Sequence, residues 1–204
     1  MPRKPQQRRS KETVQDIVEA GFIAVAKYGR DGATTRRIAD IAGISVGSLY
    51  EYFANKDDVF TAMLERYVEE VVGMLEPRVP HLVRMSLREL VIDLLYQFKE
   101  LMLRNDGLYL ECARYAVEGI YEKQFEKVEK LLMELLTHYF MHNPETVRVR
   151  DFRATAYIMI SGGVLTLNRY LVSPPANLTF EQLAEGLANM VTGYVAEERR
   201  QLET

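Results

Sequence analysis

Apolar residues recur every three or four positions along nearly the whole chain, and no useful length of it alternates apolar with polar residues. This spacing gathers the apolar side chains on one face of an α-helix. The apolar spacing, the capping residues and the helix-ending Gly and Pro residues together predict about nine helices, at 10–28, 34–43, 45–53, 55–76, 86–104, 108–117, 120–141, 146–171 and 179–200. We therefore expect an all-α protein with a small N-terminal unit, 1–56, and a larger helical body, 57–204.

The two short helices at 34–43 and 45–53 flank a tight turn, and this arrangement is typical of a helix-turn-helix. Ala39 is small where the two helices must approach closely, and Gly43 can adopt the positive φ that the turn needs. Ser45 can cap the second helix. The apolar wedge between the helices would consist of Ile38, Ile41, Ile44 and Leu49. An ordinary helical hairpin uses the same residue types, so these residues alone leave both interpretations open.

The longer stretch from Thr34 to Phe60 matches a specific pattern, T-T-x-x-I-A-x-x-A-G-I-S-x-G-x-L-Y-x-Y-F-x-x-K-x-x-V-F. In this stretch the sequence resembles the TetR family of bacterial transcriptional repressors. The match covers about 27 of the 204 residues, and the rest agrees only in length and helical character. The resemblance implies a three-helix DNA-binding domain followed by a body that dimerises and binds a ligand. Its implied partners are a double-stranded DNA operator, a small-molecule effector and a second copy of the chain.

The resemblance also implies roles for individual residues of this stretch. Phosphate contacts are implied for Thr34, Thr35, Tyr50 and Lys56, and a base contact for Arg36. Arg37 is either a second phosphate contact or solvated. The face that enters the major groove would carry Ser45, Val46, Gly47, Ser48 and Tyr52, with Ser48 and Tyr52 at base edges. That helix has no Arg, Lys, Asn or Gln, so specificity would rest on Arg36, on methyl contacts of Val46, or on DNA shape.

Charge is unevenly distributed along the chain. Residues 1–56 hold ten Lys or Arg against six Asp or Glu, while the remainder carries a net charge of -7. A basic segment of this kind suits a polyanion, although +4 over 56 residues is also compatible with chance. The tail residues Arg3, Lys4, Arg8 and Arg9 either reach an adjacent minor groove or form a generally basic, disordered tail.

The two helices nearest the C-terminus are apolar over a wider arc than one buried face requires. Each is therefore expected to bury a second face, and two helices from each of two chains would form a four-helix bundle. The alternative is that both faces are buried within one chain. The expected interface consists of Tyr157, Ile160, Val164, Leu167, Leu183, Leu187, Met190 and Tyr194.

Methionine and tyrosine are frequent in the body, and the chain has no tryptophan. Flexible Met and amphipathic Tyr suit a pocket for a mostly apolar small molecule, although the same residues also suit an ordinary core. The candidate lining residues are Met63, Tyr67, Met102, Tyr109, Cys112, Tyr115, Phe125 and Met159.

Other functional classes find little support. One cysteine cannot form an internal disulfide, and the N-terminus lacks the apolar segment of a secretory signal. No apolar run approaches the roughly 20 residues of a membrane span, so we expect a cytoplasmic protein without a membrane partner. Phosphate-binding and nucleophile-elbow motifs are absent. Glu134, His138 and His142 share a helical spacing that can hold a metal, but such spacing is common by chance.

The sequence therefore predicts a non-enzymatic, ligand-responsive transcriptional regulator that needs no cofactor. The favoured form is a repressor that binds a pseudo-palindromic operator as a homodimer and is released by a small, mostly apolar molecule. A helical small-molecule carrier or interaction module without DNA function is the alternative.

Overall fold

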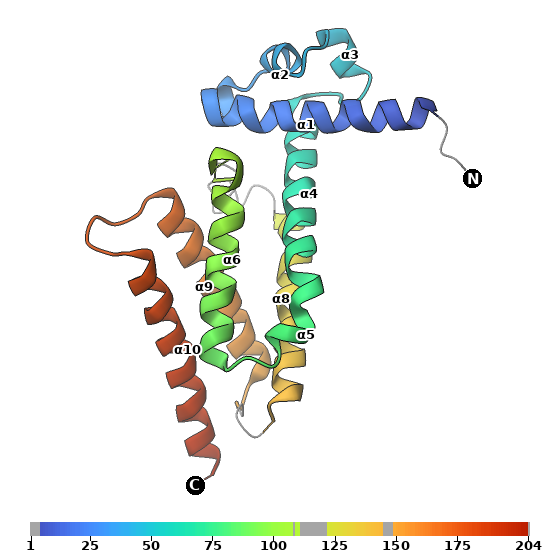
Figure 1. The fold of residues 1–204 in the computed structure, drawn as a ribbon. Helices are drawn as coiled ribbons and strands as arrows, with labels where there is room; N and C mark the ends of the chain where they lie inside the picture. The colour runs from blue at the N-terminus through green and yellow to red at the C-terminus, as the bar shows by residue number, and fades with distance from the viewer. Residues whose placement is uncertain (1–4, 108, 111–121, 145–148, 204) are drawn as a thin grey trace.

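The computed structural model describes residues 5–107, 109–110, 122–144 and 149–203, and all regular structure in these ranges is helical (Figure 1). The all-α prediction is therefore confirmed. The elements are α1 (Pro5–Gly32), α2 (Thr35–Ala42), α3 (Val46–Tyr50), α4 (Lys56–Leu75), η1 (Glu76–Arg78), α5 (Val79–Leu82), α6 (Leu87–Gly107), α8 (Glu122–His142), α9 (Phe152–Val172) and α10 (Phe180–Leu202).

Helices α1, α2 and α3 form a head at one end of the molecule. α1 lies across the start of α4, and α2 and α3 lie on the side of α1 that faces away from the body (Figure 1). Gly21 makes the crossing of α1 and α4 close, because a Cβ there would lie 2.7 Å from Met63 Sδ and 3.1 Å from Val59 Cγ1. An ion pair between Arg66 and Glu19, at 3.4 Å, adds a polar link between the same two helices.

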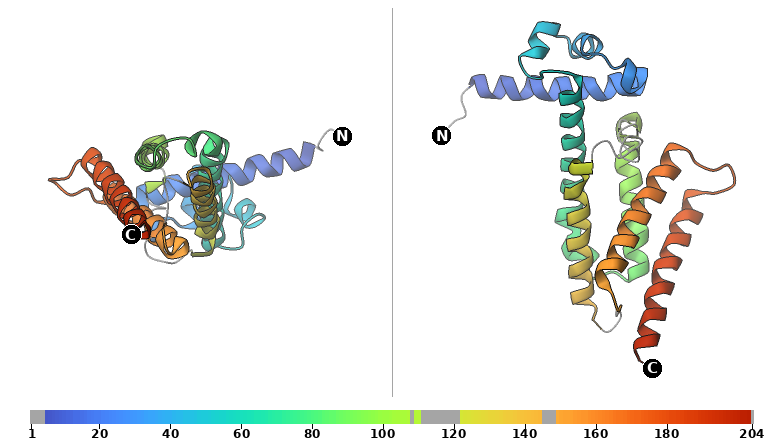
Figure 2. Two further views of the ribbon diagram at one scale, coloured as in Figure 1. Left: turned by 90° about the horizontal axis from the view of Figure 1, so that it is seen from below. Right: turned by 180° about the vertical axis from the view of Figure 1, so that it is seen from behind.

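The body is built from long helices that run away from the head. α4 passes directly from the head into the body, and α9 and α10 run along one side of it (Figure 2). One apolar cluster continues from Ile17 and Phe22 in the head through Tyr67 of α4 to Leu101 of α6. A second cluster, around Leu82 and Tyr139, lies at the end of the body far from the head. The head is therefore attached to the body through a continuous packed core rather than through a loose linker.

Most helix boundaries agree with the sequence, and the exceptions have local causes. α1 begins at Pro5 rather than near Ser10, and it contains the expected break at Gly29, where φ is 68°. α9 begins at Phe152 rather than near residue 146, because the side chain of Asp151 accepts a hydrogen bond from Ala154 N at 3.0 Å and caps the helix there.

The two prolines after α4 do not stop the helical path. Pro77 and Pro80 occupy the first turns of η1 and α5. Proline is tolerated at these positions because the first turn of a helix has no intrahelical use for its N–H group. The expected helix at 108–117 lies largely outside the described residues.

None of the helices in the described ranges combines the length and the apolar character that crossing a bilayer requires.

Candidate nucleic-acid interface and ligand cavity

The turn between α2 and α3 is a left-handed cap centred on Gly43. Its φ of 69° and ψ of 27° lie in the left-handed region, which glycine adopts without steric cost. Gly43 N donates to Asp40 O at 3.3 Å, and Ile44 N donates to Ala39 O at 3.0 Å. This pair of hydrogen bonds is a Schellman motif, and it fixes the direction in which α3 leaves α2.

Side-chain caps define the start of both short helices. The Thr34 hydroxyl accepts from Arg37 N at 3.3 Å, and the Ser45 hydroxyl accepts from Ser48 N at 3.0 Å. The Ser45 and Ser48 hydroxyls also lie 2.9 Å apart. Because each hydroxyl that accepts a backbone hydrogen bond still holds its own proton, Thr34 retains a donor for a phosphate oxygen.

The outer side of α2 and α3 presents the residues expected at DNA. Arg36, Ser45, Gly47 and Tyr50 are exposed, and Leu49 is fully buried beneath them. The hydroxyls of Thr35 and Tyr50 lie 3.3 Å apart, so the start of α2 and the end of α3 share one surface.

Two of the expected base contacts are less free than the sequence suggests. Val46 and Tyr52 are only partly exposed and pack against the core cluster of the head. The entering face therefore consists mainly of Ser45, Gly47 and Ser48 at the start of α3, with Tyr50 at its end.

Arg37 was expected either to contact a phosphate or to be solvated, and in the structure it is exposed. Its guanidinium lies 4.4 Å from the centre of the Tyr28 ring, and Nη1 donates to Gly32 O at 2.7 Å. Arg37 thus satisfies a carbonyl at the end of α1. Arg36 has no such neighbour in the described contacts and extends into solvent.

The start of α4 is held firmly beneath α3. Asn55 Oδ1 accepts from Asp57 N at 2.8 Å and from Asp58 N at 3.0 Å, which caps the helix. Lys56 is the first residue of α4, and its Nζ lies 5.9 Å from the centre of the Phe60 ring. The basic tail at 1–9 lies beyond the side chains that the structure describes, as do Arg3, Lys4, Arg8 and Arg9 within it.

Four of the residues expected to bind a ligand belong to the core instead. Met63, Tyr67, Met102 and Tyr109 are each 4% exposed or less. The Tyr109 ring lies 5.2 Å from that of Phe22 and 5.4 Å from that of Tyr67, so it joins head and body. None of these four lines the cavity described in the next paragraph. Of the other candidates, Cys112 and Tyr115 lie outside the described residues, as does the side chain of Phe125.

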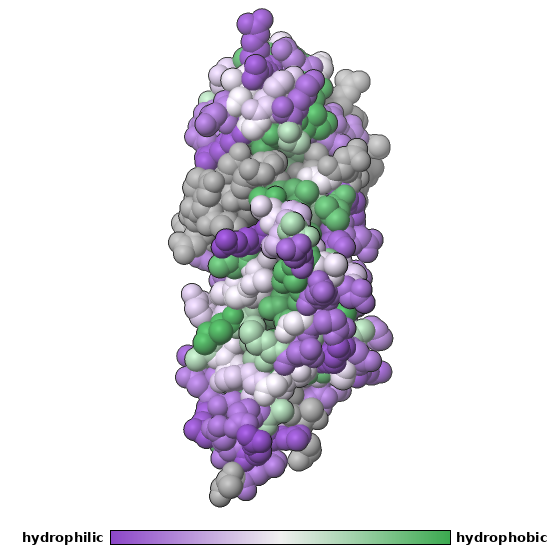
Figure 3. Space-filling model, turned by 90° about the vertical axis from the view of Figure 1, so that its left-hand side faces the viewer, coloured by the Kyte–Doolittle hydropathy of each residue, from purple (hydrophilic) through white to green (hydrophobic). Residues whose placement is uncertain are grey.

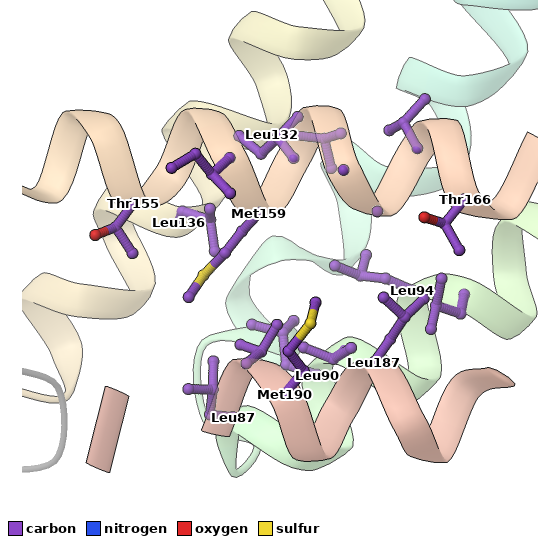
Figure 4. A pocket seen from close by; sticks show the side chains of 18 of the residues that line it. Leu87, Leu90, Leu94, Leu132, Leu136, Thr155, Met159, Thr166, Leu187 and Met190 are labelled. Carbon is purple, nitrogen blue, oxygen red and sulfur yellow. The ribbon is translucent and has the colours of Figure 1, made fainter. Parts of the chain in front are cut away.

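A cavity of about 410 Å³ lies elsewhere in the body, between α6, α8, α9 and α10 (Figure 4). Met159 is the one expected ligand-binding residue that lines it. Its wall is otherwise mostly aliphatic, with Leu90 and Leu94 from α6 and Leu136 from α8. The sequence could not identify this cavity, because leucine on a helix face is equally typical of a packed core.

The expected interface residues divide into two groups. Ile160 and Leu167 are 8% and 3% exposed and face the interior of their own chain. Val164, Leu183 and Leu187 are partly buried against the core cluster. The remaining members, Tyr157, Met190 and Tyr194, are exposed, and Ile158 and Leu165 join them as exposed apolar residues that the sequence reasoning missed.

These five exposed residues define what we call the α9–α10 face. Figure 3 views the molecule from this side and shows apolar side chains gathered between more polar ends. The sequence carries no charged residue between Arg153 and Arg169 on α9, and none between Glu185 and Glu197 on α10.

The histidine spacing on α8 does not form a metal site. Glu134 pairs with Lys130 at 3.8 Å, and both His138 and His142 are exposed. The described ranges hold no group of three His, Cys, Asp or Glu residues that could bind a metal ion.

Comparison with known proteins agrees with this architecture. Residues 17–63 match the family model for bacterial regulatory proteins of the tetR family. The nucleoid occlusion factor SlmA of Actinobacillus pleuropneumoniae is 31% identical over 75 residues, 37% of this chain and 36% of that protein. The HTH-type transcriptional repressor AcnR of Corynebacterium diphtheriae is 35% identical over 49 residues, 24% of this chain and 26% of that protein. The chain thus matches only about a third or less of the length of these relatives.

Solved structures resemble the chain over nearly its full length. The transcriptional regulator FadR from Bacillus subtilis, solved in complex with stearoyl-CoA, has a TM-score of 0.70 at 16% identity. The similarity covers 87% of this chain and 97% of that one. Residues 17–63 thus match the tetR-family model, and the chain has the fold of TetR-family structures over nearly its full length.

Proposed function

We propose that the protein is a DNA-binding transcriptional regulator that binds a pseudo-palindromic operator as a homodimer. The observation that carries this proposal is the outer surface of α2 and α3. There a capped, exposed α3 projects from a Schellman turn on a head that is packed rigidly onto α4. An exposed second helix of this kind is the element that enters the major groove in helix-turn-helix proteins.

The exposed and partly exposed groups on the outer side of the head divide into those that can contact phosphates and those that can contact bases. Thr34, Thr35, Tyr50 and Lys56 offer hydroxyl protons and an ammonium group to phosphates. Arg36 can donate two hydrogen bonds to one guanine, and Ser48 can meet a base edge near the start of α3. Gly47 carries no side chain, so the α3 backbone can approach the duplex closely. Arg37 donates from Nη1 to Gly32 O, and its alternatives remain a second phosphate contact or a solvated side chain.

Dimerisation through the α9–α10 face supplies the second reading head. Tyr157, Ile158 and Met190 are 65%, 67% and 65% exposed, and large apolar side chains so exposed on one face are typical of an interaction surface. A Cβ at Gly162, Gly186 or Gly193 would meet nothing within 4 Å, which leaves room for a second helix to approach. One short α3 contacts few base pairs, so two copies are needed for specificity.

We infer further that a small, mostly apolar molecule releases the repressor from DNA. Support comes from the cavity in the body and from a contact path to the head. α6 lines the cavity, and its Asp93 pairs at 2.9 Å with Arg78, which lies directly after α4. α4 in turn carries the head. A ligand that binds more tightly to one position of α6 would thereby favour one distance between the two heads of the dimer. If that distance does not fit the operator, ligand binding weakens DNA binding and DNA binding weakens ligand binding.

The test is the salt dependence of binding to a DNA duplex, measured by fluorescence anisotropy. Lys56→Ala should weaken binding to all sequences and lower the slope of log K against log salt by about 1 per protomer. Lys130→Ala removes an equal charge from α8 and serves as the control, with an unchanged slope. An unchanged slope for Lys56→Ala contradicts its phosphate contact. If no duplex is bound in a salt-sensitive way, the carrier function is favoured instead.

A further inference from the structure

We propose that the cavity between α6, α8, α9 and α10 binds an uncharged, elongated hydrocarbon molecule with a small polar group at one or both ends. This proposal deepens the proposed function, because it names the class of effector and the place where the effector binds. It rests on that function only for the consequence of binding, since the site itself is argued from the cavity.

The size of the cavity is the first argument. The space of about 410 Å³ is lined by buried leucines on one side and by the exposed Ile158 and Met190 on the other, so in the isolated chain it opens onto the α9–α10 face. The volume also falls within the roughly 300–1,000 Å³ of small-molecule sites. A wall of leucines makes water a poor occupant, because a buried water needs two to four polar partners.

The wall offers no partner to a charged group that lies inside the cavity. None of the side chains that line the cavity is charged, and its side-chain polar groups are the hydroxyls of Thr155, Thr166 and Tyr194. Burying an ionised group without a partner costs far more than burying a neutral one. The outer side of α9 and α10 cannot compensate, because neither helix carries a charge along the middle of the α9–α10 face.

The positions of the hydroxyls suggest the shape of the ligand. Thr155 and Thr166 lie toward opposite ends of the cavity in Figure 4, with Leu94, Leu136 and Met159 between them. Eleven residues of α9 separate the two threonines, which corresponds to about 16 Å along the helix. At one end, the hydroxyls of Thr155 and Tyr194 lie 3.3 Å apart and together could bind a hydroxyl or carbonyl group. The space between the ends would accept only hydrocarbon.

A second copy of the chain is a poorer occupant than a small molecule. Leu90 and Leu135 form part of the wall and are each 1% exposed, and they belong to α6 and α8. A partner helix lying on the α9–α10 face would be kept from them by α9 and α10 themselves. It would instead cover Ile158 and Met190, which lie on both the cavity wall and the face, and so close the cavity from outside.

The experiment titrates the purified full chain with N-phenyl-1-naphthylamine, an uncharged probe that fluoresces in apolar surroundings. We expect saturable binding of one probe per protomer, displaced by 1-dodecanol and at least tenfold less well by dodecanoate at pH 8. Leu94→Trp fills the cavity and should weaken probe binding at least tenfold. Leu103→Trp, the same substitution at an exposed site on the same helix, should leave binding unchanged.

Folding is monitored by circular dichroism. If Leu94→Trp does not fold, Thr166→Phe narrows the cavity from a half-buried position and should also weaken binding. The proposal is overturned if neither filling variant weakens binding, if dodecanoate competes as well as dodecanol, or if no saturable binding occurs. DNA binding and dimer mass are measured on the same samples. If the unsubstituted chain binds DNA but no probe, the cavity proposal alone is refuted. If it binds the probe but no DNA, the regulator function alone is refuted.

Discussion

Gly43 and Gly47 are four positions apart in the helix-turn-helix, and replacing each with alanine should affect stability differently. Gly43 has a φ of 69°, so a Cβ there is strained even though it would meet no atom within 4 Å. Gly47 lies within α3, and a Cβ would touch only Ser45 Oγ, at the ordinary distance of 3.7 Å. Replacing each with alanine therefore separates backbone strain from the approach to DNA.

The expected magnitudes follow from these conformations. Gly43→Ala should lower the free energy of unfolding by about 1–2 kcal/mol, the cost of placing an L-residue in the left-handed region. In a chain of this size, that cost lowers the melting temperature by roughly 2–8 °C. Gly47→Ala should leave stability unchanged or raise it by about 0.5 kcal/mol, because alanine loses less entropy in a helix than glycine.

Both variants should bind DNA more weakly, but for different reasons. Gly43→Ala changes the direction of α3, whereas Gly47→Ala adds a methyl group where the backbone meets the duplex. An overpacked contact costs about 1–3 kcal/mol, which corresponds to roughly 5- to 150-fold in affinity at each head. Urea unfolding at one fixed protein concentration and anisotropy titrations provide the two measurements. Undiminished DNA binding by Gly47→Ala, or wild-type stability of Gly43→Ala, would refute this reasoning.

Three further predictions concern the body. Leu165→Asp combined with Met190→Asp should convert the dimer to a monomer in analytical ultracentrifugation, because it places two charges in the uncharged α9–α10 face. A retained dimer would show that this face is not the dimer interface. Tyr139→Phe should lower stability by about 1 kcal/mol in urea unfolding, since the Tyr139 hydroxyl donates to Met85 O at 3.0 Å, and an unchanged midpoint would show that bond to be dispensable. The pKa of Glu89 is lowered by hydrogen bonds from the side chain and backbone of Ser86, so its contribution to stability is present above the ordinary carboxyl pKa and is lost as pH falls through the lowered value. Glu89→Gln should therefore flatten the acid limb of a plot of stability against pH, and an identical acid limb would contradict this effect.

The head was largely predictable from the sequence because its signals are local. Thr34, Ser45 and Asn55 cap the helices that follow them, and each cap depends on residues two or three positions away. Gly43 likewise ends α2 through hydrogen bonds within one turn. Such features need no knowledge of what else packs against the chain.

The body was less predictable because an apolar stripe does not state which neighbour will cover it. Ile160 and Tyr157 lie on the same helix, yet one faces the interior and the other solvent. Tyr109 and Met102 were expected in a pocket, and in the structure they lie in the buried cluster that connects head and body. The cavity arises where four helices meet, and no single helix carries a pattern that distinguishes a cavity wall from a packed core.

The most direct test of the account is selection of bound duplexes from a random pool, followed by measurement of the protomers bound per selected duplex. The account predicts an inverted repeat bound by two protomers, with half-site centres about 10 base pairs apart or a multiple of that distance. Recovery of no enriched sequence, or of a single half-site bound by one protomer, would contradict it.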